Sequence, residues 1–135
     1  MIEEIEVKVR GQRLYPITDR VQAVVASSGL REGLCTLFIR HTSASLTIQE
    51  NADPAVLRDL EAWLGRLVPE GDALYSHTAE GPDDMPAHIK SALTQTSVSI
   101  PIQDGRLTLG TWQGIYLWEH RRRRQRRELV VHVGA

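Results

Sequence analysis

Short strand-like runs recur along most of this chain, and they limit it to folds rich in β-structure. Ile5, Val7 and Val9 alternate with charged residues within 2–10, the pattern of a strand with one buried face. The apolar and β-branched run 34–40 predicts a mostly buried strand. Further strands are expected at 46–50, 96–102, 106–109, 113–119 and 128–133, with a tight turn at 103–105.

Three other segments carry helix signals. Thr18 is expected to cap a helix that ends near Gly29. Asp53 and Pro54 mark a second helix, as an N-cap followed by proline at the first helical position, and Pro86 is expected to open a third. No linker-like stretch divides these elements. We therefore expect one α+β domain over 1–135, with an antiparallel sheet or β-sandwich flanked by two or three helices.

Length and composition exclude several classes of protein. The 135 residues fit one domain, and a hydrophobic content of 41% excludes a disordered chain. No apolar run approaches the roughly 20 residues of a membrane span, and the first residues do not resemble a signal peptide, so we expect a cytoplasmic protein with no membrane partner. The single cysteine, Cys35, excludes a disulfide framework, and its apolar neighbours predict an inert buried thiol.

The formal net charge of −1 hides a strongly basic segment. Six arginines lie within 121–127, so residues 121–135 carry +5 and the remaining residues carry −6. Because this run falls between two expected strands, it predicts the end of a β-hairpin rather than a tail. A solvated hairpin tip is the simpler interpretation, and an anion-binding surface is the functional one.

Histidines are the first candidates for chemistry. His41 follows a buried strand, His77 lies in a polar stretch, His88 lies in the first turn of the expected third helix, and His120 ends a strand. A helix N-terminus favours the neutral form of His88, which can bind a metal or accept a proton. Three neutral imidazoles around an open position would suit Zn²⁺. Ordinary hydrogen-bonded histidines are the alternative.

Carboxylates and small polar residues give weaker signals. Asp83 and Asp84 precede the third helix, where they would cap it, hold a divalent cation or orient a ligating histidine. Ser43 and Ser45 near His41 lack the partners of a catalytic triad. Two glycines bracket Trp112 and Gln113; Trp112 would pack in the core, line a ligand pocket or form a subunit contact.

Four motifs together resemble the YjbQ-like family, also called the secondary thiamine-phosphate synthase family. They are His41-Thr42-Ser43-Ala44-Ser45 with Glu50-Asn51-x-Asp53-Pro54, Asp83-Asp84-Met85-Pro86-Ala87-His88-Ile89-Lys90, Gly110-Thr111-Trp112-Gln113-Gly114-Ile115, and Glu119-His120-Arg121 with the Arg-rich segment after it. The resemblance runs from about Leu14 to Val133. One departure is that Arg122-Arg123-Arg124-Gln125 replaces the glycine usual in this turn.

The resemblance implies an α+β fold with a β-sandwich, a homotrimer, and a polar pocket. Some members of the family are credited with weak thiamine-phosphate synthase activity. The leading hypothesis is therefore a metal-assisted enzyme acting on a small phosphorylated molecule. In it, the catalytic residues are His41, His77, His88 and Glu119; the three histidines hold a divalent ion, zinc or similar; and the substrate-binding residues are Asn51, Asp83, Trp112, Gln113, Arg121 and Arg127.

The alternative hypothesis is a non-catalytic module. In it, a trimer would bind anions or nucleic acid through the hairpin Arg121–Arg127, and binding would weaken steeply with salt. The acidic remainder of the chain and the lack of aromatic residues among the arginines argue against nucleic acid.

Overall fold

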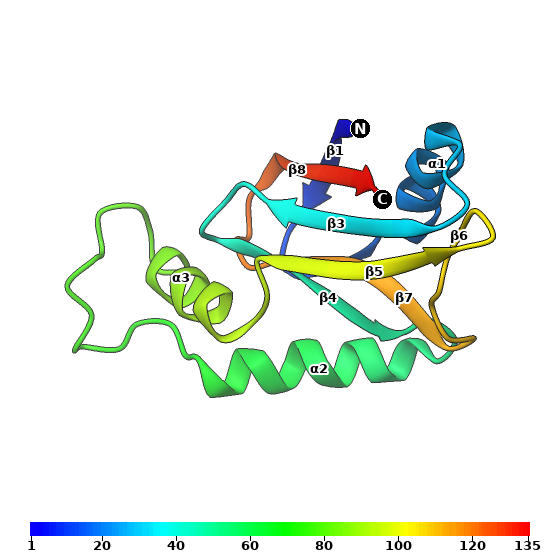
Figure 1. Ribbon diagram of the computed structural model, residues 1–135. Helices are drawn as coiled ribbons and strands as arrows, with labels where there is room; N and C mark the ends of the chain where they lie inside the picture. The colour runs from blue at the N-terminus through cyan, green and yellow to red at the C-terminus, as the bar shows by residue number, and fades with distance from the viewer.

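Eight strands form two antiparallel sheets in the computed structural model, which describes residues 1–135 (Figure 1). The larger sheet has the order β1-β8-β3-β5-β6 and the smaller one β2-β7-β4. The strands are β1 (Ile2–Arg10), β2 (Arg13–Pro16), β3 (Gly33–Ile39), β4 (Ala44–Glu50), β5 (Ser97–Gln103), β6 (Arg106–Leu107), β7 (Gln113–Glu119) and β8 (Arg124–Gly134).

Three helices complete the fold: α1 (Thr18–Ser28), α2 (Pro54–Leu67) and α3 (Asp84–Leu93). They confirm the predicted α+β class with antiparallel sheets. The predicted cap of α2 is also confirmed, because Asp53 Oδ1 accepts a hydrogen bond from the Ala55 amide at 2.9 Å. Gly29 ends α1 in the left-handed conformation, with φ of 73°, as its sequence position predicts.

Two predicted helix starts are corrected. Thr18 does not cap α1, because it is the first helical residue and its hydroxyl accepts the amide hydrogen of Ile115 at 2.8 Å. Thr18 thus ties the helix to β7 instead. Pro86 does not open α3 either, because the helix already begins at Asp84. Proline is tolerated there, since the amides of a first turn have no partner within the helix.

One apolar core joins the two sheets. It contains 20 buried residues from β1, β3, β5 and β8 of the larger sheet, from β4 and β7 of the smaller one, and from α1 together with Ile17 just before it. A second cluster fills the space between the smaller sheet and α2, where Leu64 packs with Tyr116 and Trp118. The strand β7 is therefore buried on both faces, which makes the smaller sheet a rigid support for the loops at its ends.

The predicted hairpin around the arginine run is wrong. β7 pairs with β2 and β4, whereas β8 pairs with β1 and β3, so the two strands belong to different sheets. Both edges of β7 are already occupied, and β8 has no edge of β7 left to pair with. Residues 120–123 therefore carry the chain from one sheet to the other. The turn at 103–105 is confirmed, because Gln103 pairs with Arg106 across Asp104 and Gly105.

Two other expectations can be compared with the structure. Cys35 is fully buried, and burial raises the pKa of its thiol to about 11, as expected for an unreactive core cysteine. None of the three helices is both long enough and apolar enough to cross a membrane.

Candidate functional site

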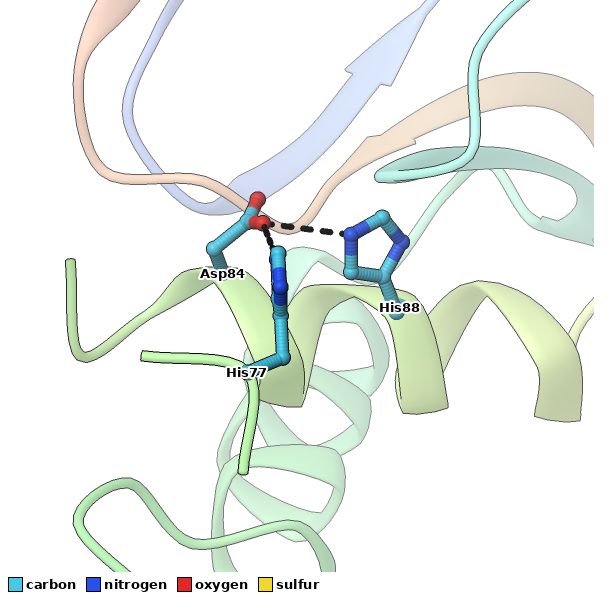
Figure 2. A group of neighbouring side chains, drawn as sticks. All are labelled: His77, Asp84 and His88. Carbon is cyan, nitrogen blue, oxygen red and sulfur yellow. Dashed lines mark hydrogen bonds and ion pairs between the residues drawn. The ribbon is translucent and has the colours of Figure 1, made fainter. Parts of the chain in front are cut away.

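The Asp84 carboxylate at the start of α3 contacts two histidine rings (Figure 2). Its Oδ2 atom is 2.7 Å from His77 Nε2 and 3.1 Å from His88 Nε2. His88 follows Asp84 by one helical turn, so both side chains project from the same face of α3. His77 comes from the loop before α3, and the centroids of the two rings are 5.4 Å apart. These three residues form the histidine–aspartate cluster.

The orientation of His88 leaves a place for a cation. Its Nδ1 atom is 3.1 Å from the carbonyl oxygen of Thr42, and because a carbonyl only accepts, Nδ1 must carry a hydrogen. In a neutral ring, Nε2 then carries no hydrogen, and its lone pair is directed at the Asp84 carboxylate. Two acceptors facing each other at this distance require a proton or a metal ion to be stable.

Arg121 holds the carboxylates around the cluster. Its Nη1 donates to Asp84 Oδ1 at 2.6 Å and its Nε to Asp83 Oδ2 at 3.0 Å, while Nη2 donates to the carbonyl oxygen of Glu80 at 2.9 Å. Asp84 therefore presents one oxygen to the arginine and the other to the histidines. The Glu80 carboxylate also lies 3.7 Å from His77 Nε2. The carboxylates of Glu80, Asp83 and Asp84 outnumber the single guanidinium of Arg121, so the local negative charge favours a cation.

Both aspartates are ionised in this arrangement. Burial by itself would raise the pKa of Asp84, but its hydrogen bond with His77 and the charge of Arg121 outweigh burial, so the pKa is lowered. Burial would likewise raise the pKa of Asp83, but hydrogen bonds from Arg121 and the Arg122 amide lower it. The carboxylate of Asp84 is therefore available as a ligand over the whole neutral range.

The donor set of the cluster fits a transition metal. One nitrogen from each histidine and one oxygen of Asp84 all lie within 4.8 Å of one another. Imidazole and carboxylate together suit zinc, iron or a similar ion, and three protein ligands leave a position open for a small molecule. The carbonyl of Thr42 supplies the outer hydrogen bond that orients a ligating histidine.

A hollow of about 640 Å³ lies beside the segment that carries Thr42. Its lining consists of Phe38, Ile39, Arg40, His41, Thr42, Ser43 and Thr96. His41 Nε2 accepts the amide hydrogen of Glu128 at 2.8 Å, so the neutral ring carries its hydrogen on Nδ1. Burial and the charge of Arg127 lower the pKa of His41, which favours this neutral form. His41 is thus a hydrogen-bond donor at the wall of the hollow.

Comparison with known proteins assigns the chain to a family. The model of the family described as UPF0047 protein YjbQ-like matches residues 3–135. The chain belongs to the YjbQ-like family. The UPF0047 protein sll1880 of Synechocystis is 58% identical over 133 residues, which cover 98% of this chain and 90% of that protein. The UPF0047 protein YjbQ of Salmonella typhimurium is 47% identical over 116 residues, covering 84% and 81%.

Solved structures agree with this assignment. A YjbQ/UPF0047 family protein of Clostridium acetobutylicum superposes with a TM-score of 0.89 at 39% identity, over 98% of this chain and 99% of that one. The conserved hypothetical protein TT1486 of Thermus thermophilus gives a TM-score of 0.87 at 35% identity, over 98% and 99%.

In this YjbQ-like chain, two of the three predicted histidines meet. His77 and His88 share the cluster, whereas His41 bonds to the backbone of β8 and lines the adjacent hollow. The third ligand atom of the cluster belongs to Asp84. Asp83 lies next to the cluster but uses both carboxylate oxygens for Arg121, one of them also for the Arg122 amide.

Three of the predicted charged residues bind each other or the aspartates. Glu119 is fully buried, and its two oxygens accept hydrogen bonds from Arg127 Nε and Nη2, both at 2.6 Å. Arg127 also donates to the carbonyl and hydroxyl oxygens of Ser43. Arg121 is occupied by Asp83 and Asp84. In this structure the guanidiniums of both arginines are bonded to carboxylates.

The remaining predicted residues lie at the other end of the smaller sheet. The strand β4 begins near Thr42 and ends just before Asn51. Because its seven residues span about 20 Å, Asn51 lies far from Thr42. The Asn51 amide donates to the carbonyl oxygens of Thr111 and Gln113, and the Gln113 side chain accepts the Gly110 amide. Trp112 is 64% exposed. Within one chain, Asn51, Trp112 and Gln113 thus belong to a hydrogen-bonded turn that is far from the histidine–aspartate cluster.

Sequence reasoning underrated two residues. Asp84 was expected, together with Asp83, to cap the third helix, hold a divalent cation or orient a ligating histidine, but it was not named among the site residues. Its spacing of four residues from His88 on a helix is a usable signal. Thr42 acts through its backbone, which no side-chain pattern reveals. His120, by contrast, is a buried structural residue: its Nε2 is 2.9 Å from Ser45 Oγ, and burial with the charges of Lys90 and Arg127 lowers its pKa to about 3.

Proposed function

We propose that the histidine–aspartate cluster binds a divalent transition-metal ion, zinc or similar, and that the protein is a metal-assisted enzyme. The observation that carries this proposal is the contact between His88 Nε2 and Asp84 Oδ2. Because Thr42 takes the only hydrogen of a neutral His88 ring, this contact needs either a second proton, on Nε2, or a metal ion shared by the two acceptors, and we propose the metal ion. His77 supplies the third ligand.

The proposed substrate is a small phosphorylated molecule in the hollow beside Thr42. His41 would donate a hydrogen bond to a phosphate oxygen from Nδ1, because its Nε2 is held by the Glu128 amide. Arg40 lines the same hollow, and its guanidinium is half exposed although it pairs with Glu4. The hollow is lined by Thr42, whose carbonyl oxygen contacts the His88 ring, so the proposed substrate site adjoins the cluster.

The proposed reaction is of the thiamine-phosphate synthase type that the family resemblance implies. A hydroxymethylpyrimidine diphosphate loses pyrophosphate, and the nitrogen of a thiazole phosphate forms the new bond to the pyrimidine methylene carbon. A bound divalent ion would stabilise the negative charge of the departing pyrophosphate. Within the chain, Arg121 and Thr42 hold Asp84 and His88 in place, from where they would bind the ion, and His41 would orient the phosphorylated substrate.

Elemental analysis and turnover of purified variants test this proposal together. The wild-type protein is expected to hold close to one equivalent of metal, and His77→Ala, His88→Ala and Asp84→Asn are expected to lose it. His41→Ala is the matched control, because it removes an imidazole from the hollow and leaves the cluster intact. It is expected to retain metal and to lose turnover. Folded His77→Ala and His88→Ala proteins with unchanged metal content and turnover would refute the proposal.

We also propose that the protein works as a homotrimer in the cytoplasm, with its sheets packed as the β-sandwich that the resemblance implies. The shared core of the two sheets supports the sandwich packing, and the trimer rests on the family resemblance. Light scattering after gel filtration would give three times the 15.2 kDa chain mass. A monomeric mass would contradict the trimer and leave the metal site unaffected.

A further inference from the structure

Four cationic side chains from opposite ends of the sequence lie together on β1 and β8. The antiparallel register places Lys8 opposite Arg126 and Arg10 opposite Arg124. Residues directly opposite each other in such a pair share one face of the sheet. All four are exposed, while the residues alternating with them on β1 are buried. We call Lys8, Arg10, Arg124 and Arg126 the basic ribbon.

The basic ribbon has little ion pairing of its own, although Glu6 and Glu128 form the next pair along the same face. Arg126 Nε is 3.6 Å from a Glu6 oxygen, and no ion pair within 4.0 Å involves Lys8, Arg10 or Arg124. Like charges directly opposite each other on a sheet destabilise it. The pair Arg10–Arg124 therefore costs stability in the free protein, and a bound polyanion would relieve the repulsion. Such an arrangement is expected where a surface is used for binding.

The geometry of the ribbon suits a chain of phosphates. Successive residues on one face of a strand are about 6.6 Å apart, and opposite residues are about 5 Å apart, so the four cations form a two-by-two array. Three of the four are arginines, which bind phosphate oxygens bidentately. The array contains no apolar side chain that could anchor it in a lipid surface.

We propose that the basic ribbon binds the phosphodiester backbone of nucleic acid without reading its base sequence. The arginine run in the sequence is weak evidence for such a partner. The strand register strengthens it, because Lys8 and Arg10 from the other end of the chain join the same basic surface. None of the four side chains contacts the histidine–aspartate cluster. This binding is therefore separate from the proposed metal-assisted reaction, and either can fail without the other.

Fluorescence anisotropy with a labelled 20-nucleotide single strand, and with its duplex, tests the proposal between 50 and 200 mM KCl. Four phosphate contacts to a single strand give a logarithmic salt slope of about −2.8, which is a rise in Kd of about fifty-fold over this range. The double variant Lys8→Gln/Arg124→Gln is expected to lower the slope by about 1.4. Its melting temperature should be unchanged or higher, because like-charge repulsion is removed.

The matched control is Arg31→Gln/Arg58→Gln, which changes the net charge equally at two exposed sites outside the ribbon. This control should keep the wild-type slope. The proposal is overturned if the wild-type protein does not bind either oligonucleotide at 50 mM KCl, or if both double variants lose affinity equally. Binding to vesicles containing anionic lipid, with no binding to nucleic acid, would also overturn it.

Discussion

Glu119 and Arg127 form an ion pair that is closed to solvent, with the Glu119 side chain fully buried and the Arg127 side chain 4% exposed. The pair joins the end of β7 to the early part of β8, and so links the two sheets beside the arginine-rich connection. Arg127 also holds Ser43, one residue from the carbonyl that orients His88. The pair thus connects the core to the segment that carries the proposed site.

Removing one member of this pair is expected to destabilise the protein strongly. Glu119→Gln leaves the Arg127 guanidinium buried without its counter-charge, at a cost of about 3–5 kcal/mol in the free energy of unfolding. Urea denaturation measures this loss. The control Glu128→Gln removes an exposed carboxylate two residues after Arg126 and should cost less than about 0.5 kcal/mol. A Glu119→Gln loss below 1 kcal/mol would show that the buried pair does not hold the sheets together.

His120 is expected to make the protein acid-sensitive. Its pKa is about 3 in the folded chain and 6.5 in an ordinary environment, so between these values the unfolded chain binds one more proton. The free energy of unfolding should therefore fall as the pH drops below 6.5, by up to about 1.4 kcal/mol for each pH unit. Denaturation at several pH values, with a chelator present, measures this slope. The variant His120→Gln should have a shallower slope, and an identical slope would contradict the assignment.

Arg121 is expected to act as a positioning residue for the proposed metal. Arg121→Gln releases Asp84 Oδ1 and should lower metal affinity by about 10- to 100-fold, the usual effect of losing an outer hydrogen bond to a ligand. Competition with a chromophoric chelator measures the affinity. Arg122→Gln is the control, because its side chain pairs with Glu70 and its backbone amide still bonds to Asp83. Equal affinities of both variants and wild type would contradict this role.

The cap of α2 is expected to contribute modestly to stability. Asp53→Ala removes the acceptor of the Ala55 amide and should cost about 1 kcal/mol. Asp59→Ala, at an exposed position inside the same helix, should change stability by less than 0.5 kcal/mol. Thermal denaturation of the two variants compares them directly. If both had the same melting temperature, the capping bond would be energetically unimportant.

Local signals in the sequence were enough to predict individual strands and helices. Alternation in 2–10 predicted β1, Asp53 and Pro54 predicted the start of α2, and the apolar neighbours of Cys35 predicted its burial, because each signal depends on residues close in the chain. The start of α3 was predicted two residues too late, at Pro86 rather than at Asp84. It also misassigned Thr18, whose hydroxyl has a distant partner on β7.

Which of these residues meet depends on how the two sheets pack. The two sheets separate β7 from β8, which turns an expected hairpin into a crossover and places Lys8 and Arg10 beside the arginines. They also bring Thr42 to His88 and leave Asn51 at the far end of β4. Strand order and register are set by burial of the whole core, a long-range property that no local pattern contains.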